Sequence, residues 1–107
     1  FIETACYTGK KVVVVLQNGS AIIPGKWNDM ASAVVEMWLA GEGAGGVCDV
    51  LCGAVNPSGR LPETFPRVMR HDFEYPGNGK MVCYNEKLHV GYRYYDRHPI
   101  ISIWSFP

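Results

Sequence analysis

The strongest constraint on the fold is an uninterrupted run of five apolar residues, Val12–Leu16, of which four are valine. β-Branched side chains fit a pleated strand, and a run without polar interruptions indicates a strand that is buried on both faces. Such strands occur mainly in parallel sheets that are covered by helices. The polar segment Gln17–Ser20 then ends the strand as a turn. The run therefore predicts an α/β fold built on a parallel sheet.

The next two segments continue with a helix and a strand. Residues 27–33 are predicted as a short helix with Asn28 or Asp29 near its N-cap, because both residue types favour that position. Residues 33–39 fit either a helix or a strand, and the glycines that follow favour a short buried strand that ends at Ala40.

Beyond these glycines the pattern indicates one more helix and then irregular structure. Val47–Cys52 is predicted as a helix that Gly53 closes. Glu63–Pro66 is expected to be a short extended piece, residues 67–87 to be irregular, and His89–Tyr95 to be a β-prone aromatic segment. Strand, helix, strand and helix in this order are typical of an open α/β layer. The predicted fold class is therefore α/β, as a partial open α/β sandwich with a mostly parallel sheet.

The composition excludes two classes of partner. The 107 residues carry ten basic and ten acidic side chains, and no segment is markedly basic. We therefore expect no nucleic-acid partner and no membrane partner, and the apolar runs are far shorter than the roughly 20 residues that span a bilayer. The chain begins at Phe1 without a signal-peptide pattern and ends on the apolar segment Trp104–Pro107. We expect a piece of a larger protein, with no localisation assigned.

The cysteines are interpreted as small buried side chains rather than as metal ligands. Cys48 and Cys52 lie one helical turn apart, which suits one buried face of the predicted helix. No spacing supports a zinc site that includes a histidine, and the sequence does not define any disulfide pairing. We therefore predict no metal and no cofactor. The residues considered are Cys6, Cys48, Cys52 and Cys83, with His71, His89 and His98.

A G-x-G-x-x-G motif separates the second predicted strand from the helix. Its glycines are Gly41, Gly43 and Gly46. A dinucleotide-binding unit needs, in addition, a second parallel strand with an acidic residue about 20 positions later. Glu63 stands at that distance, but the preceding segment Asn56–Pro62 contains two prolines and a glycine, which a central strand does not tolerate. The sequence therefore argues against dinucleotide binding, and Gly45–Gly46 are expected to allow a close backbone approach or a positive φ.

Two further groups have candidate chemistry. Asp72 and Glu74 share a face if the chain is extended there, and the choice is between an acid–base pair and the preferred solvated face. Tyr92–Tyr95 is a candidate surface for stacking on a carbohydrate or a base. The alternative is an aromatic strand in which a carboxylate pairs with Arg93. His89 lies in the same strand-like segment and is interpreted as a packed or edge residue rather than as a general base.

Three segments together resemble one known family. They are Val12–Ser20, Gly41–Pro66 and Tyr84–Asp96. Their order and spacing are similar to the C-terminal α/β-sandwich domain of glycoside hydrolase family 3, which includes β-glucosidases and β-xylosidases, and the block N-P-S-G-R-L-P-x-T-F-P is the most specific. By this resemblance residues 1–107 form a partial domain that is truncated at its N-terminal side. Its strand and helix core is 1–66, and 67–107 is an extended, loop-rich tail.

The resemblance implies a retaining, exo-acting, β-glucosidase-like hydrolase that cleaves O-glycosyl bonds with two carboxyl groups. In the family the nucleophile is an Asp on a separate N-terminal barrel domain, and the acid/base is usually a Glu upstream of the first matched strand. Neither motif is present, so none of the ten carboxylates is assigned as catalytic, and the chain alone is expected to be inactive. A β-glucoside or β-xyloside substrate is expected to bind through the missing barrel domain.

The chain departs from the family pattern at three places, and a second function stays open. Gly25–Lys26 lengthens one segment, Lys87 replaces a common glycine, and Ile100–Pro107 matches only in part. The alternative function is a noncatalytic carbohydrate-binding or scaffold module. Its candidate platforms are Trp27, Trp38, Tyr92, Tyr94 and Tyr95. Because parts of the sheet are expected to be uncovered, the isolated chain is predicted to aggregate or to be partly unfolded.

Overall fold

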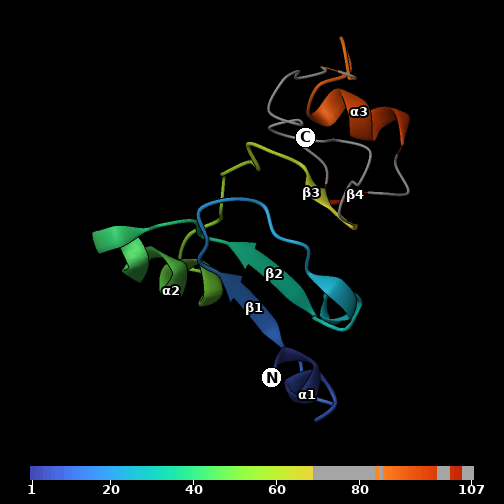
Figure 1. The fold of residues 1–107 in the computed structure, drawn as a ribbon. Coiled ribbons are helices and arrows are strands. Elements are labelled where there is room, and N and C mark those ends of the chain that lie inside the picture. The colour runs from blue at the N-terminus through green and yellow to red at the C-terminus, as the bar shows by residue number, and fades with distance from the viewer. Residues whose placement is uncertain (69–83, 85, 99–101, 105–107) are drawn as a thin grey trace. The chain divides into compact units, whose positions relative to one another are not determined.

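The computed structural model describes residues 1–68, 84, 86–98 and 102–104 of the 107-residue chain. The chain divides into two compact units, Phe1–Gly59 and Arg60–Pro107 (Figure 1). The assignment of residues 1–66 and 67–107 as the core and tail of a partial domain stays a prediction. Each compact unit is described by itself below.

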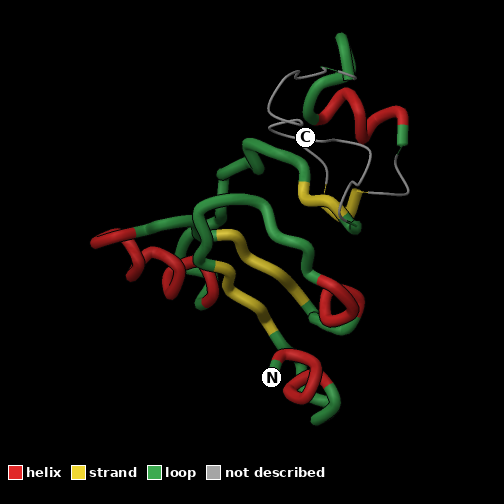
Figure 2. Tube along the Cα trace, viewed as in Figure 1, coloured by secondary structure: helices red, strands yellow, loops and turns green. Residues whose placement is uncertain are grey.

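The first unit is built on a two-stranded parallel sheet. Strand β1 (Val13–Leu16) pairs with β2 (Ala33–Glu36), in a register that runs from Val13 opposite Ala33 to Leu16 opposite Glu36. Figure 2 shows the two strands side by side, with a crossover between them that is mostly loop. Both strands consist mainly of β-branched residues, which fit the pleated backbone. The predicted α/β class with a parallel sheet is confirmed.

The expectation that β1 is buried on both faces is wrong. Val14 is only 8% exposed, whereas Val13 and Val15 are 46% and 37% exposed. Successive side chains of a strand point to opposite faces, so Val14 lies on the covered face and its two neighbours on the other. An apolar run indicates that both faces of a strand can be buried, but each face is buried only where another element packs against it. Residues 1–59 provide such an element on one face only.

The short helices of the first unit differ from the prediction in their bounds. Helix α1 (Ile2–Cys6) precedes the sheet, and the 3₁₀ helix η1 (Gly25–Asp29) lies in the crossover. The observed helix therefore begins and ends earlier than the predicted 27–33, and neither Asn28 nor Asp29 is its N-cap. Pro24 caps it instead, at φ −68°, because the proline ring already holds the backbone angle that a helical turn needs.

The helix after the glycines is confirmed, together with its C-terminal cap. The 3₁₀ helix η2 (Gly41–Gly45) leads directly into α2 (Gly46–Leu51), close to the predicted Val47–Cys52. Gly53 has a φ of +77°, and its N–H donates to the Val50 carbonyl at 3.1 Å. The Ala54 N–H donates to the Asp49 carbonyl at 2.8 Å, which completes a Schellman cap.

The second strand, β2, ends at Glu36, whereas the sequence predicted that it would end at Ala40.

The second unit pairs two short antiparallel strands. Strand β3 (Phe65–Pro66) lies within the extended segment that was predicted for residues 63–66, and it pairs with β4 (Ser102–Trp104) in an irregular register. Phe65 is 0% exposed and Thr64 is 8% exposed. The core of this unit, within the residues that can be described, is therefore centred on the Phe65 ring.

The aromatic segment of the second unit is a helix, so the predicted β-prone strand is wrong. Helix α3 (Tyr92–Arg97) starts after Gly91, whose φ is +63°. One helical turn brings the Tyr94 and His98 rings together, with 4.4 Å between their centroids. The His98 Nδ1 also lies 2.9 Å from the Tyr94 carbonyl oxygen. Contacts between residues four apart are typical of a helical turn and favour the helix over the strand preference of tyrosine.

Candidate functional site

The carboxyl ends of β1 and β2 meet at one edge of the sheet because the strands are parallel. We call residues 16–20 and 36–40, which form this edge, the carboxyl edge. Leu16 stands opposite Glu36, and the Met37 N–H continues the pairing with a hydrogen bond of 3.0 Å to the Leu16 carbonyl. Ligands of open α/β sheets bind outside the carboxyl ends of the strands. The carboxyl edge is therefore the candidate functional site of the first unit.

The two loops of the carboxyl edge touch each other. In the loop after β1, the Asn18 side-chain amide donates a hydrogen bond of 2.7 Å to the Ser20 carbonyl. A Cβ atom placed on Gly19 would lie 3.8 Å from the Leu39 Cδ1 atom of the other loop. The confirmed Gln17–Ser20 turn thus brings a glycine against the second loop.

A carboxylate and an aromatic residue form the core of this edge. Glu36 Oε1 accepts a hydrogen bond of 2.7 Å from the backbone N–H of Trp38. The φ of Trp38 is +54°, in the left-handed region that favours glycine. Glu36 Oε2 is buried and has no hydrogen-bond partner among the described residues. The carboxylate is therefore held by one oxygen, and it fixes the backbone of a partly exposed tryptophan.

Sequence reasoning named Trp38 as a candidate carbohydrate platform but missed Glu36. The signal was present in the strand pattern. In the register of the sheet, Glu36 stands opposite Leu16, two positions along from the pair Val34 and Val14, so it shares the face on which Val14 is buried. A charged residue at a covered position of a short apolar strand needs a specific partner.

The glycine motif does not have the geometry that was expected for Gly45–Gly46. Their φ values are −61° and −62°, and a Cβ atom on either residue would meet nothing within 4 Å. The expectation of close backbone approach or positive φ at this pair is therefore wrong. The positive φ is at Gly41 instead, at +53°, where the chain turns into η2. Strand β3 pairs with β4 and not with the parallel sheet, so it is not the second parallel strand that a dinucleotide-binding unit needs.

The cysteines of α2 are not buried. Cys48 and Cys52 are both exposed, so the predicted buried helix face is wrong, and Cys6 is partly exposed. Nothing in residues 1–59 covers that face of α2. Within the described ranges, no three side chains of histidine, cysteine, aspartate or glutamate are grouped as metal ligands. His71, Asp72, Glu74 and Cys83 lie outside the described residues.

The aromatic cluster on α3 packs against itself. The Tyr94 and Tyr95 rings meet edge to face at 5.8 Å, and the Arg93 guanidinium lies 5.9 Å from the centre of the Tyr92 ring. The interpretation of this segment as an aromatic strand is wrong, because residues 92–97 form a helix, whereas the candidate stacking surface stays a prediction. An Arg97 guanidinium nitrogen lies 2.6 Å from His89 Nε2. His89 is exposed and lies outside the helices and strands, so it is neither packed nor at the edge of a strand. In the described part of the chain, no helix has both the length and the apolar character to cross a membrane.

The carboxyl edge and the segment that follows it lie in a stretch that matches a known family. The family description "Glycosyl hydrolase family 3 C-terminal domain" matches residues 1–92. The chain belongs to glycoside hydrolase family 3. The resemblance seen in the three sequence segments is therefore confirmed, and residues 1–92 belong to the C-terminal domain of this family.

Individual members of glycoside hydrolase family 3 are similar over most of the chain. "Thermostable beta-glucosidase B" of Acetivibrio thermocellus is 44% identical over 110 residues, which cover 98% of this chain and 14% of the relative. "Probable beta-glucosidase J" of Emericella nidulans is 45% identical over 89 residues, covering 79% of this chain and 10% of the relative. "Exo-alpha-(1->6)-L-arabinopyranosidase" of Bifidobacterium breve is 39% identical over 99 residues, which cover 89% of this chain and 13% of the relative.

The chain thus spans between 10% and 14% of the length of these relatives. No solved structure matches it significantly.

Proposed function

We propose that this chain is part of a retaining, exo-acting glycoside hydrolase that cleaves β-glucosides or β-xylosides, and that the chain itself does not catalyse the reaction. The observation that carries the proposal is the family match over residues 1–92, together with relatives named as β-glucosidases. The longer protein that would contain this chain is called the parent enzyme below. Because the chain spans 14% or less of the three relatives described above, most of the parent enzyme lies outside it.

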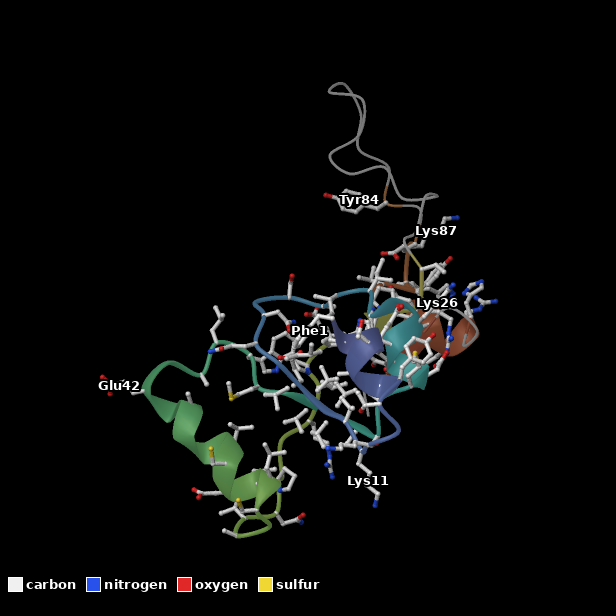
Figure 3. The ribbon with its side chains drawn as sticks, turned by 90° about the horizontal axis from the view of Figure 1, so that it is seen from below. Phe1, Lys11, Lys26, Glu42, Tyr84 and Lys87 are labelled. Carbon is white, nitrogen blue, oxygen red and sulfur yellow. The ribbon has the colours of Figure 1, made fainter. Side chains whose placement is uncertain are left out.

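The carboxylates of the chain fit a supporting role. A retaining glycosidase needs a nucleophilic carboxylate and a second carboxyl group that acts as acid and base, about 5–5.5 Å apart. The acid is usually held in a protected environment that favours its protonated form. Glu42 and Asp49 are exposed, as are most of the described carboxylates (Figure 3 shows Glu42 at the outer end of η2). Glu36 is partly buried, but its Oε1 is engaged by the Trp38 backbone.

Exposed apolar side chains in the first unit support the same proposal. Exposed apolar side chains that share one face, as Val13 and Val15 do on β1, mark a surface that another domain covers. Here β1, the loop after β2 and the segment around α2 all expose such side chains. They include Val13, Val15, Leu39, Leu51 and Val55. We propose that the rest of the parent enzyme covers part of this surface.

A paired assay tests the proposal. The parent enzyme is expected to hydrolyse 4-nitrophenyl β-glucoside or β-xyloside with retention of the anomeric configuration, followed by NMR of the first product. The 107-residue chain is expected to show no turnover of either compound. Turnover by the chain alone, inversion by the parent enzyme, or no hydrolysis of any aryl glycoside by the parent enzyme would each refute the proposal.

The same assay addresses the noncatalytic alternative. A carbohydrate-binding or scaffold module would bind sugar in a protein that has no glycosidase activity at all. The partly exposed Trp38 and the exposed Tyr92 are the residues that favour this second candidate. Saturable sugar binding by an inactive parent protein would establish it in place of the enzyme.

A further inference from the structure

Two positions of the carboxyl edge, Glu36 and Trp38, depart from ordinary backbone and side-chain preferences. Trp38 adopts a φ of +54°, which a glycine tolerates freely and a bulky residue does not. Two residues before it, Glu36 Oε2 is buried without a hydrogen-bond partner among the described residues. Either feature alone is destabilising, because one strains the backbone and the other leaves a charged oxygen desolvated.

The two departures belong to one arrangement. The second oxygen of the same carboxylate, Glu36 Oε1, accepts the Trp38 N–H at 2.7 Å. A charge-assisted hydrogen bond of this length holds the peptide of Trp38 in its left-handed conformation. The Glu36 carboxylate therefore holds the backbone from which the Trp38 indole projects. Locally unfavourable features that support one another are typical of functional sites rather than of packing alone.

We propose that Glu36 is a positioning residue that fixes the Trp38 indole as a stacking surface for a sugar ring of the substrate at the carboxyl edge. This inference rests on the proposed glycosidase function. An indole offers a large, rigid apolar face and a polar N–H at its rim. A pyranose ring has the complementary character, with C–H groups on its faces and hydroxyl groups around them. Trp38 is partly exposed and the following Leu39 is 75% exposed, so solutes reach this edge in the described structure.

Trp27 provides the matched comparison. It is also a partly exposed tryptophan of the first unit, but it lies within η1, and its backbone is not among the strained positions. A tryptophan that only fills space is accommodated there without strain. A glycine at position 38 would adopt this φ without strain, so the strain at this position comes with the tryptophan side chain.

Replacement of Trp38 by glycine separates the ring from the strain. In the parent enzyme, Trp38→Gly is expected to raise KM for the better aryl glycoside about tenfold with kcat within about threefold, because ground-state and transition-state binding are lost equally. The relief of backbone strain is expected to offset part of the stability that is lost with the partly buried ring, and thermal unfolding measures the balance. Trp27→Ala serves as the control, with an unchanged KM. A Trp38→Gly enzyme with the KM of the wild type would overturn the proposal.

A second pair of variants covers the case in which Trp38→Gly does not fold. Trp38→Tyr keeps an aromatic face, and Trp38→Leu keeps apolar volume without one. Tyrosine is expected to retain the KM and leucine to raise it. Equal KM values for both variants would contradict the inference, because a packing residue does not distinguish them.

The positioning role of Glu36 has its own test. Glu36→Gln keeps an acceptor for the Trp38 N–H and is expected to retain the KM, whereas Glu36→Ala is expected to raise it as Trp38→Gly does. The part of the glucose-induced quenching of tryptophan fluorescence that is lost in Trp38→Tyr reports the Trp38 ring, because Trp27, Trp104 and the tryptophans outside this chain are the same in both proteins. This part of the quenching is expected to weaken in Glu36→Ala. An unchanged KM and quenching in Glu36→Ala would refute the role. A parent enzyme without glycosidase activity would instead refute the proposed function.

Discussion

The described residues include two non-glycine positions with a left-handed backbone, one in each compact unit, and their surroundings differ. Trp38 has a φ of +54° and is held by the partly buried carboxylate of Glu36. Lys87 has a φ of +52° and lies in an exposed turn, where its N–H donates to the Tyr84 carbonyl at 3.1 Å (Figure 3 labels both residues). The same backbone strain is therefore supported by a charged side chain in one unit and by an ordinary turn in the other.

The difference shows that strain alone does not mark a functional site. At Lys87 the turn closes with backbone hydrogen bonds, and an exposed lysine adds nothing that depends on its unusual φ. The family resemblance placed a glycine at this position, and the positive φ gives the physical reason for it. At Trp38 the strain coincides with a desolvated carboxylate and an aromatic ring, and this coincidence supports a role in binding.

The largest expected effect concerns the interiors of the two units. Phe65→Ala is expected to reduce stability by about 3–5 kcal/mol, because a fully buried ring leaves a cavity. Val14→Ala removes less buried surface and is expected to cost about 1–2 kcal/mol. Denaturant unfolding of the parent enzyme, followed by hydrogen exchange in the two units, measures both. A smaller effect of Phe65→Ala would show that the second unit is not centred on this ring.

The next effect concerns the carboxylate that supports Trp38. Glu36→Ala is expected to reduce stability by about 1–3 kcal/mol, since it removes a hydrogen bond to a charged group. Glu36→Gln should recover most of the loss. Glu42→Ala, at an exposed acid of the same unit, is the control and should change stability by less than about 0.5 kcal/mol. Equal melting temperatures for Glu36→Ala and Glu42→Ala would remove the distinction between Trp38 and Lys87.

Glycines with and without a positive φ provide a similar contrast. Gly53→Ala is expected to cost about 1–2 kcal/mol, because alanine is strained at a φ of +77°. Gly45→Ala is expected to be neutral or to stabilise by up to about 1 kcal/mol, since Gly45 has a helical φ and a Cβ atom would meet nothing within 4 Å. Thermal unfolding of the two variants checks the opposite signs.

The smallest expected effect is a gain in stability at Lys87. Lys87→Gly should stabilise the chain by a few tenths to about 1 kcal/mol, because the relief of strain exceeds the entropy that glycine loses on folding. KM is expected to stay the same, in contrast to Trp38→Gly. Lys26→Gly, in the 3₁₀ helix η1, is the control and should be mildly destabilising. A loss of stability in Lys87→Gly would mean that its side chain has contacts that compensate for the strain.

The elements that follow from local chemistry were predictable from the sequence. β-Branched residues identified β1, the glycines after residue 40 favoured a strand at β2, and Gly53 identified the end of α2. Burial was harder to predict, because Val13, Val15 and the cysteines of α2 depend on layers that residues 1–59 do not supply. Helix α3 was missed because its stability comes from contacts one turn apart, as between Tyr94 and His98, which a β-prone composition conceals.

The candidate site was predictable only in part. Trp38 was named from the sequence as a candidate platform, but the carboxyl edge was not, although a parallel sheet brings the two loops to one edge. The contact between Glu36 and Trp38 was not predictable, because it depends on a backbone angle that local preference disfavours for tryptophan.

The central claim is that this chain supports a glycosidase without supplying its catalytic carboxylates. The most direct test replaces each of the ten Asp and Glu residues by Asn or Gln in the parent enzyme and measures kcat. Every variant is expected to keep kcat within about a hundredfold of the wild type, because none removes the nucleophile or the acid/base. A kcat loss of about 10⁴-fold in one variant, at an unchanged melting temperature and with partial rescue by azide, would contradict the account.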